Sequence, residues 1–297
     1  MNRSVQRVIC VAGAAAVVLL IASGAWAQGA AAPDTSGVTI TGEYGPHLPP
    51  RIAKQPYAAQ ADRLINVLHV FMVALFVAWG TFFVYCLVRF RQRPGHKAVA
   101  EPVKAKISKY VEVAVAVFEV ILLVGLSIPA WGAVKNDLPT ESEDPLHVRV
   151  VAEQFAWNFH YPGADGIFGR TNPEAIDLAT NPVGLDPDDP NAADDFSTGE
   201  FHIPVDRKVI VWITSKDVIH SFSVPVLRVK QDAIPGMRIP MWFEAGVTGN
   251  YEVACAQLCG NNHYSMKALM VVHTPAEYEE WFAEASAPPE EFDEDEF

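Results

Sequence analysis

The sequence predicts a membrane-anchored all-β protein, in which a hairpin of two transmembrane helices precedes an exported β-sandwich or barrel. Two apolar stretches, 64–88 and 110–134, are each long enough to cross a bilayer as a helix. Beyond residue 135, short alternating strands punctuated by Pro and Gly replace the helical runs. A hydrophobic content of 50% and a mean hydropathy of +0.14 agree with this division, since both are high for a soluble enzyme.

The chain begins with the pattern of a secretory signal peptide, which we place at residues 1–27. Arg3 and Arg7 precede an apolar run that ends in small residues, so cleavage is expected after Ala27. An uncleaved anchor helix is the alternative, although the apolar core is short for a membrane span. Residues 28–63 are rich in Ala, Gly and Pro without a sustained period, and are expected to form an extended periplasmic arm.

Charge orients the hairpin of residues 64–134. The connector between its two helices, 89–109, holds seven Lys or Arg residues against the single acid Glu101. The positive-inside rule therefore places this loop in the cytoplasm. An exported N-terminus and two spans then put everything after Lys135 on the periplasmic side. We expect a multi-pass protein of the bacterial inner membrane, in contact with membrane lipid.

The exported part is expected to form a β domain over residues 135–285, followed by an acidic, disordered tail at 286–297. From residue 135 onward there are 29 acidic and 10 basic residues, a formal balance of −19. Such a field repels nucleic acid and attracts cationic partners. Alternation of apolar residues predicts strands at 146–150, 209–213, 251–253 and 269–272.

Two further segments of this domain have patterns of their own. Residues 172–200 form an acidic stretch that lacks the glycine and the terminal glutamate of an EF-hand calcium loop, so a solvated surface loop is expected. Residues 275–285 predict a short helix with Tyr278, Trp281 and Phe282 on one face.

Metal-binding residue types are concentrated in the run CAQLCGNNHYSM, which places Cys255, Cys259, His263 and Met266 within twelve residues. Thiolate and thioether are soft ligands that favour copper, and imidazole suits copper too, whereas zinc sites seldom use methionine. Two thiolates at this spacing can bridge a pair of copper ions, which predicts a dinuclear electron-transfer centre. The alternative in an oxidising compartment is a disulfide between the two cysteines.

A second imidazole is available in the segment DVIHSFSVP, as His220 between two predicted strands. With the stretch Asp217–Gly236, the cysteine string and the two membrane helices, the chain resembles subunit II of the haem-copper cytochrome c oxidases. The resemblance covers nearly the whole mature chain. It implies a cupredoxin-like Greek-key β-sandwich that carries the dinuclear copper centre CuA.

The resemblance also implies how the two coppers are held. The implied ligands are the side chains of His220, Cys255, Cys259, His263 and Met266 and the backbone carbonyl of Gln257. The two cysteines would bridge both metals, each histidine would cap one, and the methionine and the carbonyl would bind axially, one to each copper. Ligands on loops fixed by a rigid sandwich limit the geometric change on reduction, which favours fast electron transfer.

The chain departs from the family pattern at two places. Most members have Glu where this chain has Gln257, and that carboxylate helps bind a magnesium ion at the contact with subunit I. An amide oxygen carries no formal charge, so the magnesium site is expected to be weakened. In the aromatic stretch that receives electrons, Phe155 stands in the usual tryptophan position, with Trp157 behind it. This favours a changed donor or docking geometry, and neutral drift among core aromatics is the alternative.

Four more residues match family positions near subunit I. Glu112 corresponds to a glutamate at the mouth of a proton pathway, and a snorkelling acid is the alternative. Glu119 lies about 10 Å deeper on nearly the same helix face and is expected to contact subunit I. Lys230 and Asp232 match positions at the subunit I boundary, where proton exit has been placed. A surface ion pair is the alternative for these last two residues.

The function implied by the resemblance is that of the electron-receiving subunit of a proton-pumping terminal oxidase. CuA would accept electrons from a periplasmic cytochrome c, or from a cytochrome-bearing partner complex, and pass them to haem in subunit I, where oxygen is reduced to water. Subunits I and III are the implied partners. The sequence has no C-x-x-C-H haem attachment motif, so the donor is expected to be a separate protein.

Three other classes of protein agree less well with these residues. A quinol-oxidase subunit that has lost copper conflicts with the complete set of ligand side chains. A copper-delivery or storage protein would not need a membrane hairpin with buried acids. A nitrous-oxide reductase shares the dinuclear site, but it would need a large additional catalytic domain and no membrane helices.

Overall fold

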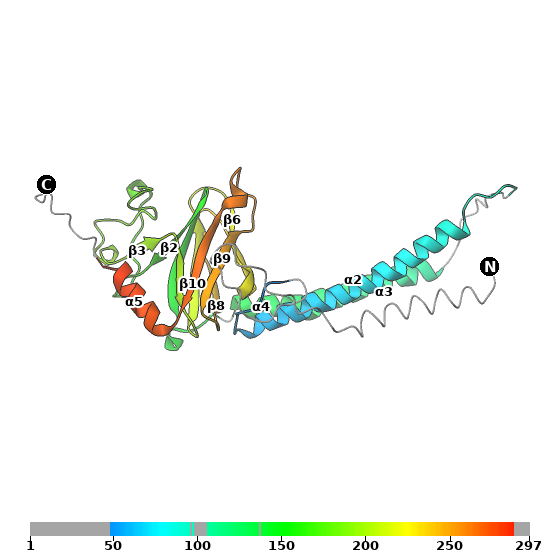
Figure 1. Cartoon of the computed structure of the whole chain (residues 1–297), viewed down its shortest axis with the longest axis horizontal. Coiled ribbons are helices and arrows are strands. Elements are labelled where there is room, and N and C mark those ends of the chain that lie inside the picture. The colour runs from blue at the N-terminus through cyan, green and yellow to red at the C-terminus, as the bar shows by residue number, and fades with distance from the viewer. Residues whose placement is uncertain (1–47, 96, 98–105, 137, 288–297) are drawn as a thin grey trace, which may run out of the picture. The chain divides into compact units, whose positions relative to one another are not determined.

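The structure is a computed structural model that describes residues 48–95, 97, 106–136 and 138–287 (Figure 1). The predicted signal peptide, the arm up to residue 47, part of the connector that was predicted to be cytoplasmic, and the acidic tail from residue 288 lie outside the described residues. The described chain divides into two compact units. A helical unit covers residues 59–131, and a β unit combines residues 48–58 with residues 132–287.

The first helix, α2, runs from Pro56 to Arg89. It begins inside the stretch that was expected to be an extended arm. Proline suits the first turn of a helix, because its missing N–H would have no partner there and its φ is already helical. Residues 48–55 belong to the β unit instead, where Ala53 forms a β-bridge with Ala245.

The second helical stretch consists of α3 (Lys106–Leu122), the π-helical turn η1 (Leu123–Ser127) and α4 (Ile128–Asn136). The wider turn precedes Pro129. A proline ring clashes with the carbonyl four residues earlier, here that of Gly125, and a wider turn relieves such a clash. The helix therefore continues past the interruption, and the predicted span 110–134 lies within it.

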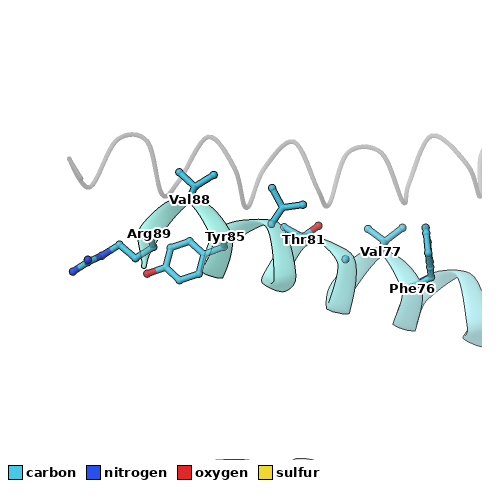
Figure 2. A pocket seen from close by; sticks show the side chains of 8 residues that line it. Phe76, Val77, Thr81, Tyr85, Val88 and Arg89 are labelled. Carbon is cyan, nitrogen blue, oxygen red and sulfur yellow. The ribbon is translucent and has the colours of Figure 1, made fainter. Parts of the chain in front are cut away.

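Both helical stretches have apolar surfaces that are exposed in the chain by itself. Pro56–Arg89 and Ser108–Gly132 are long and apolar enough to cross a membrane. Figure 2 shows Phe76, Val77 and Val88 along α2, where they line a largely apolar pocket. Helices with satisfied backbone groups and outward apolar side chains are the form that a hydrocarbon environment requires. The rings of Phe71 and Phe118, 4.4 Å apart, join α2 to α3.

The β unit is a sandwich of two five-stranded sheets, with strand orders β3-β2-β1-β5-β8 and β4-β10-β9-β6-β7 (Figure 1). The strands are β1 (Leu146–Glu153), β2 (Ala156–Tyr161), β3 (Phe196–Thr198), β4 (Phe201–Pro204), β5 (Lys208–Ser215), β6 (His220–Val224), β7 (Val229–Ala233), β8 (Ile239–Glu244), β9 (Gly249–Cys255) and β10 (Lys267–His273). The pairs β1–β5 and β4–β10 are parallel, and the other pairs are antiparallel. The predicted fold class is confirmed, and each predicted strand lies within an observed one.

Short helical turns connect the strands. They are η2 (Glu141–Glu143), η3 (Pro173–Ala175), η4 (Pro190–Ala192), η5 (Pro225–Leu227) and η6 (His263–Ser265). The last helix, α5 (Pro275–Ala285), has the predicted bounds and begins with a capping box formed by Thr274 and Glu277. Its Trp281 stacks on His202 of β4, with ring centroids 4.1 Å apart and planes inclined by 3°.

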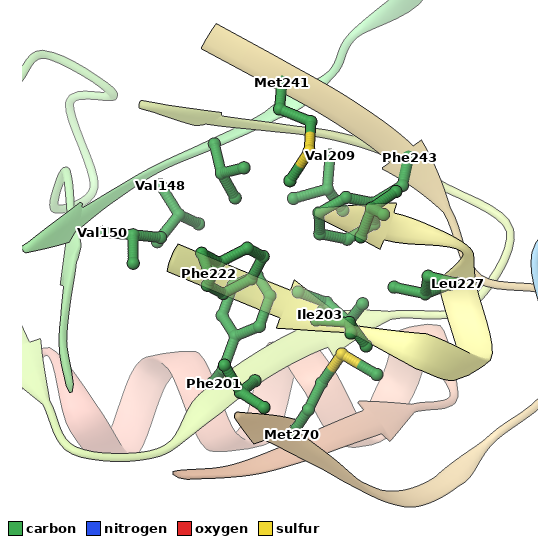
Figure 3. Close-up of a cluster of buried hydrophobic side chains, with 14 of the residues drawn as sticks. Val148, Val150, Phe201, Ile203, Val209, Phe222, Leu227, Met241, Phe243 and Met270 are labelled. Atoms are coloured by element: carbon green, nitrogen blue, oxygen red, sulfur yellow. The ribbon is translucent and has the colours of Figure 1, made fainter. Parts of the chain in front are cut away.

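The hydrophobic core lies between the two sheets (Figure 3). Buried and partly exposed residues alternate strictly along β1, so that Val148 and Val150 point inward. They meet Phe222 and other inward residues of the opposite sheet, and Phe159 stacks on Phe201 across the core with centroids 4.8 Å apart. Burying one such side chain contributes about 1.5–3 kcal/mol, so this layer stabilises the frame on which the strand ends are held.

The acidic segment between β2 and β3 is organised by its own side chains. The Asn181 amide donates to the carbonyls of Ala175 (3.0 Å) and Leu185 (2.9 Å), and its oxygen accepts from the Leu185 N–H (2.7 Å). Gly184, at φ +69°, closes the turn where a Cβ would meet the Asn172 carbonyl at 2.6 Å. Residues 172–200 were expected to form a surface loop. They form a loop that is held together by its own hydrogen bonds and that leads into β3.

Candidate metal centre

Three neighbouring strands bring the predicted ligands to one end of the second sheet. His220 opens β6, Cys255 closes β9, and Met266 directly precedes β10. The strand ends are joined by hydrogen bonds from the Cys255 N–H to the Met266 carbonyl (3.0 Å) and from the Ala256 N–H to the Ser221 carbonyl (2.9 Å). Residues far apart in the chain are therefore held at fixed separations.

Cys259 lies at the centre of this cluster. Its Sγ is 3.9 Å from Cys255 Sγ, 3.7 Å from His263 Nδ1 and 3.8 Å from Met266 Sδ. One ligand atom from each of His220, Cys255 and Cys259 lies within 4.8 Å of the other two. Metal–thiolate bonds are about 2.3 Å long, so two sulfurs on a shared metal lie at most about 4.6 Å apart. The sulfur separations meet this limit.

Both cysteines of the cluster are free thiols. Their 3.9 Å separation is far longer than the roughly 2.05 Å of a disulfide bond. Burial, followed by the neighbouring Cys255, raises the pKa of the Cys259 thiol to about 11. Two adjacent, desolvated thiols favour a cation between them, because a soft metal ion stabilises the thiolate form that burial disfavours.

His220 is fully buried and held in one orientation by Asp217. The Asp217 carboxylate accepts from His220 Nε2 at 2.8 Å and from the N–H groups of Gln154 (2.7 Å) and Val218 (2.6 Å). Partial burial alone would raise the pKa of Asp217, but these hydrogen bonds outweigh it and hold the pKa below its usual range. The other ring nitrogen, His220 Nδ1, is buried with no hydrogen-bond partner among the described residues, as expected of a metal-ligating atom.

The backbone carbonyl of Gln257 also belongs to the cluster. It lies 3.1 Å from Cys255 Sγ, at the rim where the side chains of residues 256–258 are exposed. This carbonyl oxygen is therefore close enough to the sulfur cluster to be a candidate oxygen ligand. The six predicted ligand groups are therefore gathered by the fold.

The two predicted electron-receiving aromatics lie beside this cluster at different depths. Trp157 is 2% exposed, and its ring meets His220 edge-on with centroids 6.3 Å apart. Phe155 is half-buried against Gly260, where a Cβ would approach the Phe155 ring to 2.9 Å. Gly260 has φ +143°, so a larger residue there would be strained and would push Phe155 away.

The remaining predicted residues lie outside the cluster. Glu112 and Glu119 are exposed on α3 in the helical unit. Lys230 and Asp232, on β7, are 3.9 Å apart as a half-exposed ion pair. Asp232 also accepts from the hydroxyl of Ser221, next to His220, at 2.7 Å.

Sequence reasoning missed two residues that support the site. Asp217 was noted only as the start of a motif, although an acid three residues before a candidate ligand is a signal for such a hydrogen bond. Gln154 donates from its side chain to the Cys259 carbonyl at 2.5 Å and from its backbone to Asp217. No local signal identifies Gln154, because its partners are distant in the chain.

A two-sheet sandwich with thiolate, imidazole and thioether ligands gathered at its strand ends defines the class of cupredoxin-like, copper-binding electron-transfer proteins. Two apolar helices add a membrane anchor to that class.

Comparison with known proteins narrows the class. The family model described as "Cytochrome C oxidase subunit II, periplasmic domain" matches residues 146–273. The "Alternative cytochrome c oxidase subunit 2" of Bradyrhizobium diazoefficiens is 33% identical over 222 residues, which cover 74% of this chain and 78% of the relative. The "Cytochrome c oxidase subunit 2" of Synechocystis sp. is 30% identical over 254 residues, which cover 80% and 75%. Among solved structures, the periplasmic domain of subunit II (CoxB) of Bradyrhizobium japonicum matches with 28% identity and a TM-score of 0.35, over 47% of this chain and 92% of that one.

The chain belongs to the cytochrome c oxidase subunit II family. It is a membrane-anchored oxidase subunit with an electron-receiving role, and its cluster of sulfur and nitrogen ligands is a copper-binding site.

Proposed function

We propose that the copper site is the dinuclear centre CuA and that it passes electrons from a periplasmic cytochrome c to haem in subunit I of a proton-pumping oxidase. One observation supports this proposal most strongly: Cys259 Sγ lies within 3.9 Å of a second thiol, an imidazole nitrogen and a thioether sulfur. A single metal of the blue-copper type uses one thiolate. A buried second thiolate at bridging distance favours two metals.

Each residue has a separate task in this proposal. Cys255 and Cys259 would bridge the metals, while His220 and His263 would each cap one. Met266, 2% exposed, and the Gln257 carbonyl would supply one axial ligand each. When bound, the copper pair would take up and release one electron at a time. The sandwich would hold the ligands nearly still during this exchange, because each is fixed by strand pairing or by a hydrogen bond from a neighbour.

Electrons would arrive on the face where the copper-binding loop is exposed. Phe155 would receive them from the donor, with the buried Trp157 behind it in edge contact with His220. Leu258 and Tyr264, 78% and 86% exposed on the same loop, would provide the apolar surface on which a donor docks. Subunits I and III would be the partners within the membrane.

Proton movement and magnesium binding would involve residues away from the copper. We propose that Glu112 aids proton uptake into subunit I and that Glu119 contacts that subunit. Lys230 and Asp232 would lie at its boundary. The Gln257 amide would hold a magnesium ion there more weakly than a glutamate, because it carries no charge.

Paramagnetic resonance of the purified full-length chain loaded with copper tests the proposal. We expect two coppers per chain and a multi-line signal from one electron shared between them. Cys259→Ser should abolish that signal, whereas Cys86→Ser, which changes a cysteine of α2, should leave it intact. A four-line mononuclear signal, or one copper per chain in the unaltered protein, would disprove the dinuclear assignment.

A further inference from the structure

A second site lies on the outer face of the other sheet, away from the copper ligands. Strand register sets His160, Arg149 and Trp212 side by side across β2, β1 and β5. All three side chains line a cavity of about 420 Å³. Arg238 and Lys216 line it as well, together with Thr171 and three residues of the acidic loop, Pro173, Ile176 and Val183. The cavity is therefore rich in cationic side chains although the domain as a whole is strongly acidic.

Arg149 is held in place before any ligand arrives. Its guanidinium lies over the Phe168 ring, 4.1 Å from the centroid, and donates to the Gly169 carbonyl at 2.9 Å. Burial, followed by repulsion from Arg238, lowers the pKa of Arg149 to about 10. Arg149 and Arg238 line the same cavity and repel one another, and an anion bound by both would relieve that repulsion.

His160 adds a buried polar atom without a partner. The residue is 0% exposed, and its Nε2 lies 2.6 Å from the carboxylate of Asp195. Its other ring nitrogen, Nδ1, has no hydrogen-bond partner among the described residues. A buried ring nitrogen in a cavity wall is costly unless a ligand or water satisfies it. Burial lowers the pKa of His160, and Asp195 counteracts only part of that shift. The neutral ring donates from Nε2 to Asp195, so Nδ1 can accept a hydrogen bond from a hydroxyl of a bound ligand.

Three acids near these cationic side chains already have partners. Glu141 lines a neighbouring pocket with Arg149 and Arg238 and lies 3.4 Å from His147. Asp195 accepts from His160 and from the N–H groups of Gly163 (3.2 Å) and Gly169 (2.9 Å). Glu153 pairs with Lys216 at 2.5 Å. Within the described part of the chain, neither Arg149 nor Arg238 makes an ion pair with a carboxylate. Asp195 still attracts the Arg149 guanidinium and offsets part of its repulsion from Arg238. Two guanidiniums with one shared, already hydrogen-bonded carboxylate leave net positive charge for a ligand to neutralise.

We propose that this cavity binds a phosphate group, held by the guanidiniums of Arg149 and Arg238, while Nδ1 of His160 accepts a hydrogen bond from a hydroxyl of the ligand. Guanidinium forks match phosphate oxygens two at a time, and a tetrahedral oxyanion can accept from three directions at once. The group comes either from free inorganic phosphate or from the head group of an anionic phospholipid. The proposal is independent of the copper centre, since it uses none of the proposed copper ligands.

Calorimetric titration of the copper-loaded, full-length chain with inorganic phosphate, at constant ionic strength in an uncharged detergent, tests the free-phosphate source. We expect saturable binding at one site, weakened about tenfold or more in Arg238→Gln, because a charge-assisted hydrogen bond is lost. Arg238 is exposed, so its replacement leaves the fold intact. The matched control is Arg207→Gln, since Arg207 is bound to Asp144 outside the cavity at 3.0 Å and should not affect binding.

A second arm tests the lipid source. The chain is placed in nanodiscs of phosphatidylcholine, with or without phosphatidylglycerol, in a buffer free of inorganic phosphate, and its thermal unfolding is followed. A head group in the cavity would raise the unfolding midpoint in the unaltered chain and in Arg207→Gln, but not in Arg238→Gln. A specific response in either arm supports the site and identifies the source. If neither arm responds, or if the two arginine variants behave alike, the proposal is wrong.

Discussion

Asp217 determines which nitrogen of His220 faces the sulfur cluster. Its carboxylate is fixed by two backbone N–H groups as well as by the imidazole, so the histidine is oriented before any metal binds. Such a preformed ligand reduces the reorganisation that accompanies electron transfer. The residue thus acts on the copper site without being a ligand.

Replacing Asp217 by Asn should weaken copper binding by about 10- to 100-fold, the usual cost of removing an outer partner of a ligating histidine. The measurement is a competition titration of the full-length chain against a copper chelator. Asp206→Asn is the matched control, because Asp206 pairs with Lys54 away from the cluster and asparagine tolerates its φ of +62°. Equal copper affinity in Asp217→Asn and the unaltered chain would remove the positioning role.

At the scale of secondary-structure elements, β4, β10 and α5 meet around a pair of histidines. His202 Nδ1 lies 2.8 Å from His273 Nε2, and Glu200 lies 3.3 Å from the other nitrogen of His202. Burial, followed by repulsion from His273, lowers the pKa of His202 to about 4, although Glu200 acts in the opposite direction. Trp281 covers the His202 ring, so α5 is docked on a histidine that resists protonation.

Stability of the β unit should therefore fall as the pH is lowered from about 6.5, the ordinary histidine pKa, to about 4. In this pH window His202 binds a proton in the unfolded chain but not in the folded chain. Lowering the pH therefore favours the unfolded state. His202→Gln should show a smaller fall, because it removes one of the groups responsible. Thermal unfolding of both proteins across this range makes the comparison, and parallel curves would contradict the assignment to His202.

The helix α3 carries two acids that are exposed in the chain by itself. If Glu112 aids proton uptake, Glu112→Gln should slow oxygen consumption by the assembled oxidase, since an amide cannot exchange a proton in the physiological range. Glu119→Gln should act less on turnover, because contact with another subunit does not require a titrating group. Oxygen uptake by the two variant oxidases, corrected for haem content, provides the measurement. Unchanged turnover in Glu112→Gln would exclude the proton role.

At the scale of the whole molecule, the helices and the β unit have different tasks. The apolar helices provide an anchor, and the acidic β unit provides a rigid support for the copper ligands together with a negative field around them. Most charges of that field lie on the surface, where salt screens them. The field therefore affects how fast a partner arrives more than how tightly the fold holds together.

Electron uptake from a basic cytochrome should slow as ionic strength rises, because the screening length falls from about 10 Å at 0.1 M salt to about 3 Å at 1 M. Stopped-flow reduction of the copper-loaded chain over this range gives the rates. A neutral small-molecule reductant is the control and should show little dependence on salt. A flat response with the cytochrome would exclude electrostatic docking.

The sequence by itself determined the order of elements and the family. Two apolar runs and alternating strands are local patterns, and each was found where it was predicted. The string of proposed ligands is local as well, since it lies within twelve residues. Five of the side chains proposed to bind copper could be named from the sequence. Four of them follow one another in a single loop, and the fifth, His220, lies in a recognisable segment of its own. Bridging by the two cysteines and the roles of Glu112, Phe155 and Trp157 stay predictions.

Only the tertiary structure decided which distant groups support that loop. Gln154 reaches Cys259 across 105 positions of the chain, and the cavity joins Arg149 of β1 to Arg238 before β8. Sequence patterns report only on residues that are neighbours along the chain, whereas sheet register and loop folding decide which side chains meet in space. The tertiary structure also decided where α2 begins. Residues 48–55 belong to the β unit, and the helix begins after them, at Pro56.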